Sequence, residues 1–300
     1  MLIENYNQSF ITDYFDTKFV SLYHANKDIV INNNILRTHA GKKTLLSFNH
    51  NINEFNFNDY KYVDKIVFFN LTTKPEEQYD DFKISRIHKD THISWIIDKE
   101  FIDSFTKPGR ANRHRRACLE CQNILDIKKE CNPNEFKALT KQWLEETKKF
   151  MQSTASWDNH YITCPERQEF INKNEIKEYF FYDKTNNKLV CYSIWGLTDS
   201  GEIIIMYRKA VQEFHRELTR FCDYYALKDI WNSDWHKTEN LIAHTGESSS
   251  GFGKFKMLKY PSVATEKWYT VFDNSNVQKQ QEEQTQTQTQ QNQPKQKSLF

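Results

Sequence analysis

Residues 177–209, KEYFFYDKTNNKLVCYSIWGLTDSGEIIIMYRK, decide the fold of this 300-residue chain. Aromatic and β-branched residues dominate three short stretches, and two polar segments, KTNN and DSG, separate them. Asn, Asp, Ser and Gly are the residues that tight turns between strands favour. The pattern therefore predicts three successive strands, at 177–183, 188–197 and 202–209.

After residue 209 the apolar period changes to that of a helix. One helix face is predicted to carry the apolar side chains of Val211, Phe214, Leu218, Phe221, Cys222 and Tyr225. We expect this helix to end near residue 227. The elements expected after it are a strand at 229–234, a helix at 236–243, a Gly-Ser loop, a strand at 255–261 and a last strand at 263–272.

Strands are also expected nearer the N-terminus, followed by a short helix. The ranges are 42–50, 64–73 and 82–98 for the strands and 99–105 for the helix. A strand at 124–130 comes next, and two helices with acidic first turns, at 133–151 and 165–173, lead into the three central strands. From residue 124 the predicted order is strand, two helices, three strands, helix, strand, helix and two strands.

Composition and charge limit the classes of function. The net charge is +1, so affinity for nucleic acid would have to come from a local patch. The N-terminus has no basic start or apolar run, and the longest apolar stretches are too short to cross a bilayer, which predicts no membrane insertion. The six cysteines fit a reducing compartment better than a disulfide framework. We therefore expect a protein of the cytoplasm, in a bacterial cell or an infected host cell.

The element order from residue 124 to residue 272 resembles the GNAT acyltransferase fold. That resemblance implies an α+β protein with a mixed β-sheet flanked by helices, in which the fourth and fifth strands splay apart to admit an acyl donor. The closing stretch, GFGKFK at 251–256 followed by Pro261 and then EKW at 266–268, looks like the end of the FemX-like and lysyl-phosphatidylglycerol-synthase-like branch. Members of that branch carry two GNAT-like halves and transfer aminoacyl groups from charged tRNA.

The resemblance implies a division into three parts. Residues 1–121 would be a degenerate GNAT-like half that ends in a basic helix, and residues 122–273 would be the GNAT-like catalytic domain. Residues 274–300 form a Gln-rich tail without a periodic apolar face, which predicts disorder.

The expected donor site departs from the family pattern. GNAT enzymes that use acetyl-CoA hold its pyrophosphate in a Gly-rich turn, because only Gly lets backbone N–H groups approach so closely. The corresponding turn here, residues 208–216, has no glycine. Arg208, Lys209 and Arg216 are expected to hold a donor phosphate by charge instead. The sequence thus favours aminoacyl-tRNA or another acyl donor over acetyl-CoA, and the donor itself stays unknown.

The resemblance also gives candidate catalytic residues. Backbone N–H groups of the fourth strand, around Tyr207, would face the donor carbonyl. Asp234 and His236, at the expected tip of the fifth strand, are the candidates for a base and its orienting partner. The alternatives are that Asp234 caps the next helix and that His236 is an ordinary surface residue.

Two further basic groups are candidate binding residues. Lys254 and Lys256 follow the Gly-Ser loop and, by the resemblance, would contact the donor; the alternative is a pair of solvated lysines on an edge strand. The candidates for nucleic-acid contacts are Arg110, Arg113, Arg115 and Arg116, whose guanidinium groups match phosphate oxygens. A solvated basic face is the alternative.

The spacing of two cysteines and a histidine suggests either a zinc site or a packed helix face. Cys118 and Cys121 form a Cys-x-x-Cys pair with His114 one helical turn earlier, a spacing that suits a packed helix face as well as zinc. We predict buried or free thiols and no metal.

The chain ends in QKSLF, which resembles the peptide by which proteins bind the bacterial DNA sliding clamp. Gln296, Leu299 and Phe300 would be the contact residues; the alternative is a chance end to a low-complexity tail. The leading hypothesis is an acyl- or aminoacyltransferase recruited by the clamp, with DNA, for instance a modified base in a viral genome, as acceptor. One alternative is an aminoacyl-tRNA-dependent transferase acting on a protein, peptide or lipid headgroup. The other is a non-catalytic adaptor that binds the clamp or nucleic acid.

Overall fold

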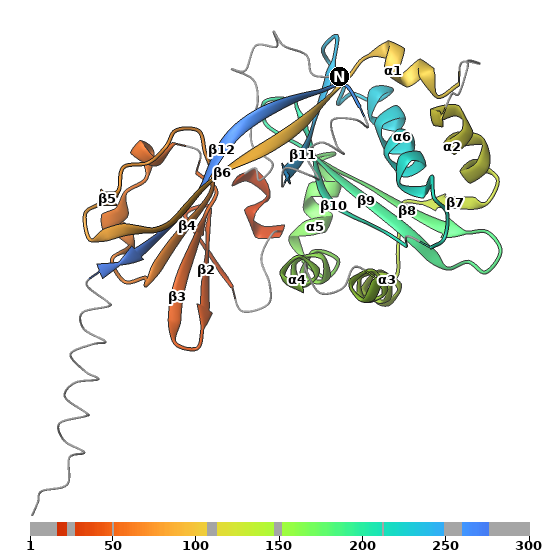
Figure 1. Ribbon diagram of the computed structural model, residues 1–300. Coiled ribbons are helices and arrows are strands. Elements are labelled where there is room, and N and C mark those ends of the chain that lie inside the picture. Colours follow the sequence, from red (N-terminus) through yellow and green to blue (C-terminus); the bar gives the residue numbers. More distant parts are fainter. Residues whose placement is uncertain are drawn as a thin grey trace, which may run out of the picture. The chain divides into compact units, whose positions relative to one another are not determined.

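The computed structural model describes residues 17–22, 28–49, 51–106, 113–146, 152–211, 213–248 and 260–275. The chain divides into two compact units, one of residues 1–26 and 90–266 and the other of residues 27–89 and 267–300. It passes between them inside two long strands, β6 (Phe82–Ile97) and β12 (Ser262–Asn274) (Figure 1). The boundary that we expected at 121/122 falls inside the first unit.

The first unit is built on a mixed sheet. Its strands after β6 are β7 (Leu125–Lys128), β8 (Ile176–Asp183), β9 (Leu189–Leu197), β10 (Ile203–Ala210) and β11 (Leu241–Ser248). They lie in the order β6, β11, β10, β9, β8, β7. All neighbours in this series are antiparallel except β10 and β11, which are parallel. The three central strands, β8 to β10, match the predicted ranges within one or two residues.

Three helices cover one face of this sheet. They are α1 (Lys99–Ser104), α2 (Arg113–Gln122) and α6 (Leu218–Trp231). Apolar residues of α6 such as Phe221 and Ile230 are packed in one cluster with Trp95 of β6 and Ile205 of β10. Burial of this cluster removes a large apolar area from water, which is the main favourable term in folding.

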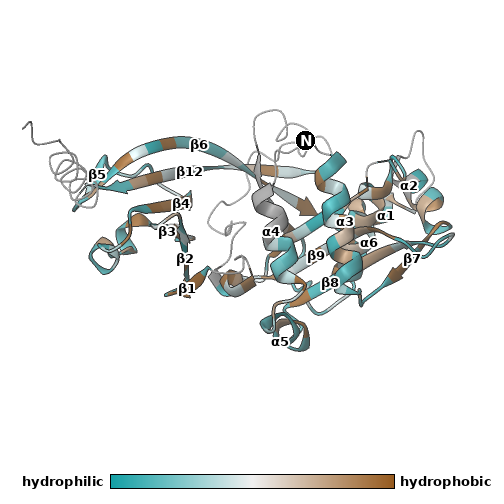
Figure 2. Ribbon diagram, turned by 90° about the horizontal axis from the view of Figure 1, so that it is seen from below, coloured by the Kyte–Doolittle hydropathy of each residue, from teal (hydrophilic) through white to brown (hydrophobic). Residues whose placement is uncertain are grey.

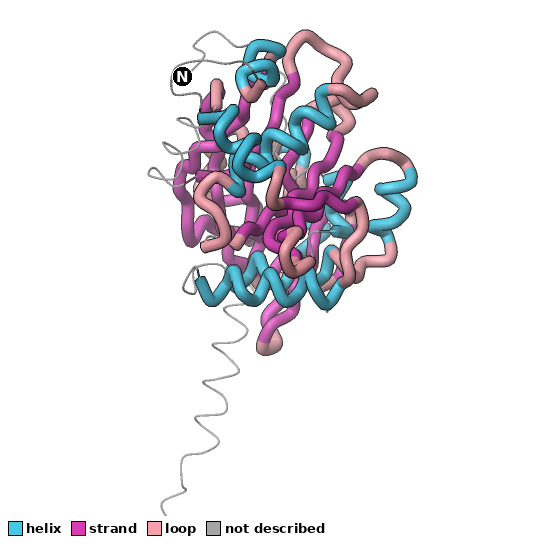
Figure 3. Tube along the Cα trace, turned by 90° about the vertical axis from the view of Figure 1, so that its right-hand side faces the viewer, coloured by secondary structure: helices cyan, strands magenta, loops and turns pink. Residues whose placement is uncertain are grey.

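Other helices cover the opposite face (Figure 3). They are α3 (Pro133–Glu146), α4 (Gln152–Tyr161), α5 (Glu166–Asn172) and the 3-10 helix η2 (Thr17–Leu22). Phe136 of α3 stacks on Tyr192 of β9 at 4.1 Å between ring centroids, and Phe170 of α5 contacts Phe19 of η2. All seven residues of α5 are at least partly exposed, and the helix is mostly hydrophilic in Figure 2.

The second unit has its own core, and its strands belong to the same 12-stranded sheet. Its strands are β1 (Ile29–Ile31), β2 (Asn34–His39), β3 (Lys42–Ser47), β4 (Lys65–Leu71) and β5 (Gln78–Tyr79), with the outer parts of β6 and β12. Two 3-10 helices, η3 (Ile52–Glu54) and η4 (Phe57–Tyr60), connect β3 to β4. Phe55, Phe57, Phe68 and Phe272 pack edge to face around the centre of this core. Whether this unit descends from a second GNAT copy stays a prediction.

Two predicted elements after the central strands are wrong. The strand expected at 229–234 is the end of α6 and the turn after it, and the helix expected at 236–243 is a bend followed by β11. Ile230 is fully buried three residues after Leu227, so the apolar face of the helix continues beyond the predicted end. The predicted α+β fold class is confirmed: the first unit is a mixed sheet flanked by helices.

Candidate active site

The strands β10 and β11 separate soon after they begin. Within the described chain they pair only at Ile203–Ala243 and Ile204–His244. At that point the register of β10 against β9 shifts between Ile205 and Tyr207, which places a bulge at Met206. Bulges bend a strand and change its hydrogen-bonding direction. Beyond Ile204 the described backbone of β10 no longer pairs with its parallel neighbour.

Arg208 lies on the α6 face of β10 and forms a buried ion pair. Its guanidinium donates to Asp223 of α6, whose side chain is 0% exposed, and the Tyr260 hydroxyl lies 3.3 Å from the other Asp223 oxygen. Burial alone would lower the pKa of Arg208, but the charge and hydrogen bond of Asp223 raise the pKa above its ordinary value. Arg208 therefore holds β10 to α6, and its positive charge is already compensated.

Lys209 points to the opposite face, as the alternation of a strand dictates. Its Nζ lies 3.2 Å from Asp158 Oδ2, and it sits 4.4 Å from the ring centroid of Trp143. Tyr192 donates to the same aspartate, and its hydroxyl is 3.0 Å from Thr140 Oγ1. Asp158, Lys209, Tyr192 and Thr140 are all buried. This network connects α3 and α4 to the central strands.

Tyr207 is also turned inward. It is buried, its hydroxyl donates to the carbonyl of Leu22, and its ring lies 4.8 Å from that of Tyr161. Tyr161 in turn donates to Glu178, which Arg167 holds with two hydrogen bonds of 2.6 and 2.5 Å. The side chain of Tyr207 is thus part of the core, and the backbone role expected for this residue stays a prediction.

A buried polar trio sits where the pairing of β10 and β11 ends. His244 Nδ1 lies 2.8 Å from Ser94 Oγ, and His244 Nε2 lies 2.8 Å from Glu202 Oε2. The exposed fractions are 3% for His244, 1% for Ser94 and 5% for Glu202. No motif in the sequence marks these three residues, although a strand over LIAHT at 241–245 would place His244 on the face away from α6. The trio joins β6 and β11 to Glu202, the residue directly before β10.

The first turn of α6 does not offer a phosphate cradle. Its N-cap residue is Glu217, which is 4% exposed and accepts a hydrogen bond from Arg220. A helix N-terminus favours an anion, but here the chain's own carboxylate already occupies that region. Arg216, in the preceding turn, is exposed. Of the three residues expected to bind donor phosphate, the structure thus places Arg216 at the surface and Arg208 and Lys209 in buried ion pairs.

Asp234 and His236 lie elsewhere than expected. They are in the connection from α6 to β11, which is at the N-terminal ends of β10 and β11 and so opposite the splayed ends. The Asp234 carboxylate accepts two hydrogen bonds from Asn174, at 3.0 and 2.9 Å. His236 stacks on Trp231 at 3.8 Å. The structural premise for a catalytic role of this pair, the tip of a fifth strand, is therefore wrong, and so is the helix that Asp234 was expected to cap.

The other predicted residues are only partly described. Arg115 and Arg116 are exposed on α2, while the side chain of Arg113 lies outside the described part. The remaining residues outside it are Arg110, Lys254, Lys256, Gln296, Leu299 and Phe300.

The Cys-x-x-Cys pair is packed in the core. Burial raises the pKa of the Cys118 and Cys121 thiols to about 12, so both are protonated at neutral pH. Within the described ranges, no three His, Cys, Asp or Glu side chains form a group that could hold a metal ion. Nor does any described helix combine the length and hydrophobicity needed to cross a membrane.

Comparison with known proteins gives structural likeness only. No family model and no curated protein matches the sequence. Among solved structures, the chain is similar to a conserved protein of unknown function from Bacteroides thetaiotaomicron VPI-5482, at 10% identity over 86% of this chain and 89% of that chain, with a TM-score of 0.51. It is also similar to L-PGS from Bacillus licheniformis, at 14% identity over 81% of each chain and a TM-score of 0.46. A tandem GNAT protein from the clavulanic acid biosynthesis pathway matches at 10% identity over 80% of this chain and 77% of that chain, with a TM-score of 0.44. At such identities the likeness to the Bacteroides protein is one of fold.

Proposed function

We propose that this chain is a GNAT-like acyltransferase that holds an acyl donor in the opening between β10 and β11. The observation that carries the proposal is the early separation of these parallel strands at Ile204, together with the bulge at Met206. A donor carbonyl placed there would meet backbone N–H groups of β10 that no longer pair with β11. Such fixed donors stabilise the negative charge that develops on the carbonyl oxygen during acyl transfer.

The donor in this proposal is an aminoacyl-tRNA or a related acyl carrier rather than acetyl-CoA. The absence of glycine from 208–216 and the buried carboxylate of Glu217 at the start of α6 both oppose a tightly held pyrophosphate. A large nucleic-acid donor can obtain affinity elsewhere, for instance from the exposed Arg115 and Arg116 of α2.

The experiment for the transfer step uses the full chain with radiolabelled aminoacyl-tRNA in one arm and radiolabelled acetyl-CoA in the other. DNA, a peptide mixture and anionic lipid vesicles serve as acceptors. We expect label transfer from aminoacyl-tRNA. Transfer from acetyl-CoA alone would overturn the donor assignment, and no transfer from either would favour the adaptor alternative.

A matched pair of variants connects any activity to the opening. Ala210 is the last residue of β10 and packs against the core beneath α6. A210W would place an indole where β10 leads toward the first turn of α6, whereas A210S keeps the space open. We expect A210W to abolish transfer and A210S to retain it, with circular dichroism showing that both fold. Equal activity of the two variants would place the reaction elsewhere.

Recruitment by the DNA sliding clamp is a separate part of the proposal and is supported by the sequence alone. DNA would then be the acceptor. A random coil of about 25 residues, which the composition of the tail predicts, spans roughly 25 to 30 Å, so the domain could act on DNA near the clamp. The test is binding of the full chain to a bacterial sliding clamp on a biosensor surface, compared with the L299A/F300A variant. Unchanged binding of that variant would remove the clamp from the proposal.

A further inference from the structure

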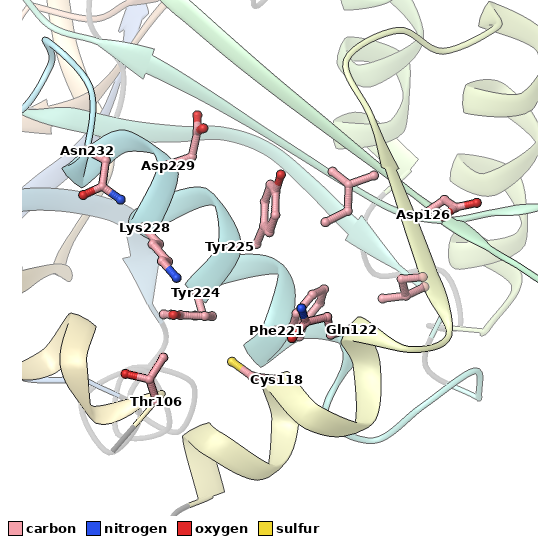
Figure 4. Close-up of a pocket in the computed structure, with 12 residues that line it drawn as sticks. Thr106, Cys118, Gln122, Asp126, Phe221, Tyr224, Tyr225, Lys228, Asp229 and Asn232 are labelled. Carbon is pink, nitrogen blue, oxygen red and sulfur yellow. The ribbon is translucent and has the colours of Figure 1, made fainter. Parts of the chain in front are cut away.

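A second site lies away from the strand opening. A cavity of about 490 Å³ lies between α2, β7 and the side of α6 that runs from Phe221 to Asp229 (Figure 4). Strand β7 is the edge strand of the sheet, and β8 and β9 lie between it and β10, where the opening begins. The cavity is therefore distinct from the proposed donor site, and its size is typical of small-molecule pockets, roughly 300 to 1,000 Å³.

Aromatic side chains form the wall on the α6 side. Phe221, Tyr224 and Tyr225 line the cavity. Tyr224 is 5% exposed and stacks on Phe105 at 3.8 Å between centroids, and Tyr225 contacts the ring of Phe181 edge to face. Packing holds these rings in place before any ligand arrives, which reduces the entropy cost of binding. Leu125 and Ile127 of β7 add aliphatic surface on the other side.

The acidic groups of the lining leave little negative charge in the cavity. Asp229 is already engaged by the Tyr179 hydroxyl at 2.7 Å and by Lys129 and Lys177 at 3.7 and 3.9 Å. In Figure 4 its carboxylate points away from Tyr224, and the carboxylate of Asp126 points away from the α6 wall.

Lys228 supplies the positive charge. Its amine points toward Tyr224 in Figure 4, and Nζ lies 5.6 Å from that ring centroid. Among the described residues no carboxylate lies within 4.0 Å of this amine. Arg115 is exposed on α2 at the i, i+3, i+7 spacing with Cys118 and Gln122, two residues that line the cavity. The cavity thus combines aromatic walls with a cation at one side.

We propose that this cavity binds a small aromatic anion, with the anionic group at Lys228 and the ring against Tyr224 and Tyr225. Aromatic faces bind planar rings by offset or edge contacts, and a lysine amine binds a carboxylate or a phosphate through charge-assisted hydrogen bonds. An aromatic carboxylate and a mononucleotide share this chemistry. The proposal does not depend on the acyltransferase assignment.

The test is isothermal titration calorimetry of the full chain with two matched ligand pairs. One pair is naphthalene-2-carboxylate and naphthalene-2-carboxamide, and the other is adenosine 5′-monophosphate and adenosine. We expect the anion of one pair to bind and its neutral partner to bind more weakly, and the pair that responds identifies the source of the ring.

Two lysine variants complete the test. K228Q removes the proposed cation, and K141Q removes an exposed lysine of α3 outside the cavity. Loss of a charged hydrogen bond should weaken anion binding by roughly tenfold or more in K228Q and leave K141Q unchanged. Equal binding of charged and neutral partners, an unaffected K228Q, or no binding of either anion at millimolar concentration would each overturn the proposal. Because both lysines are exposed, both variants are expected to fold, and circular dichroism checks this.

Discussion

Replacing Arg208 by Met should destabilise the first unit strongly. The Asp223 carboxylate is 0% exposed and loses the cation that compensates its charge, while the hydroxyl of Tyr260 at 3.3 Å supplies only a neutral hydrogen bond. Removing one partner of a buried ion pair costs about 3 to 5 kcal/mol. For a domain of about 150 to 250 residues each kcal/mol lowers Tm by roughly 2 to 4 °C, so a fall of about 10 °C is expected.

The assay is urea and thermal unfolding of R208M, D223N and the double variant R208M/D223N. The double variant removes both charges and should regain most of the lost stability, because the main cost in R208M is a buried carboxylate without its compensating cation. K173M is the control: the Lys173–Glu169 ion pair is short, at 2.6 Å, but exposed, and its loss should change nothing measurable. Two results would contradict this reasoning: R208M as stable as the unmodified chain, or R208M/D223N no more stable than R208M. Either result would mean that Arg208 does not stabilise the fold, and it would favour a role in donor binding.

Three further outcomes are expected. G196A should lower stability by about 1 to 3 kcal/mol in urea unfolding, since its Cβ would lie 2.8 Å from Phe19 Cε2, and adding F19A should not be additive with it. Y192F should cost roughly 1.5 to 3 kcal/mol in the same assay, because it removes a hydrogen bond to a buried aspartate while keeping the ring; a cost near zero would contradict the buried network. Burial raises the pKa of Cys118 and Cys121 from 9.0 to about 12. The stability that the neutral thiols contribute is therefore complete below pH 9 and is lost as the pH rises toward 12. Over that pH window the urea midpoint should fall more steeply in the unmodified chain than in C118A/C121A.

The central strands could be predicted from sequence because their signals are local. Residues 177–209 combine β-branched and aromatic runs with turn residues, and β8, β9 and β10 appear where expected. The Asn-Asn and Ser-Gly turns fix their connections, and positive φ angles of 54° at Asn187 and 84° at Gly201 show why those residue types are needed.

The secondary structure predicted after residue 227 is wrong because of an equally local signal. The segment DIWNSD contains Ile230 and Trp231, which suit a strand, yet tertiary packing extends α6 through them. Because of this error the fifth strand was predicted at 229–234, whereas it is β11 at Leu241–Ser248. Asp234 and His236 were therefore predicted at the end of that strand, and they lie in the connection before it instead. The same error hid His244, because the range 236–243 was assigned to a helix and the next residues to a loop.

The two basic residues of β10 are adjacent in the sequence but have different surroundings in the fold. Arg208 and Lys209 are adjacent and look like one positive patch, but a strand points them to opposite faces, where Asp223 and Asp158 neutralise them. Neither aspartate is near them in sequence, so the pairing follows from the fold and not from a motif. For the proposed acyltransferase the consequence is specific: with both strand cations committed, donor affinity has to come from groups beyond β10, and a donor with many phosphates meets that need better than one with a single pyrophosphate.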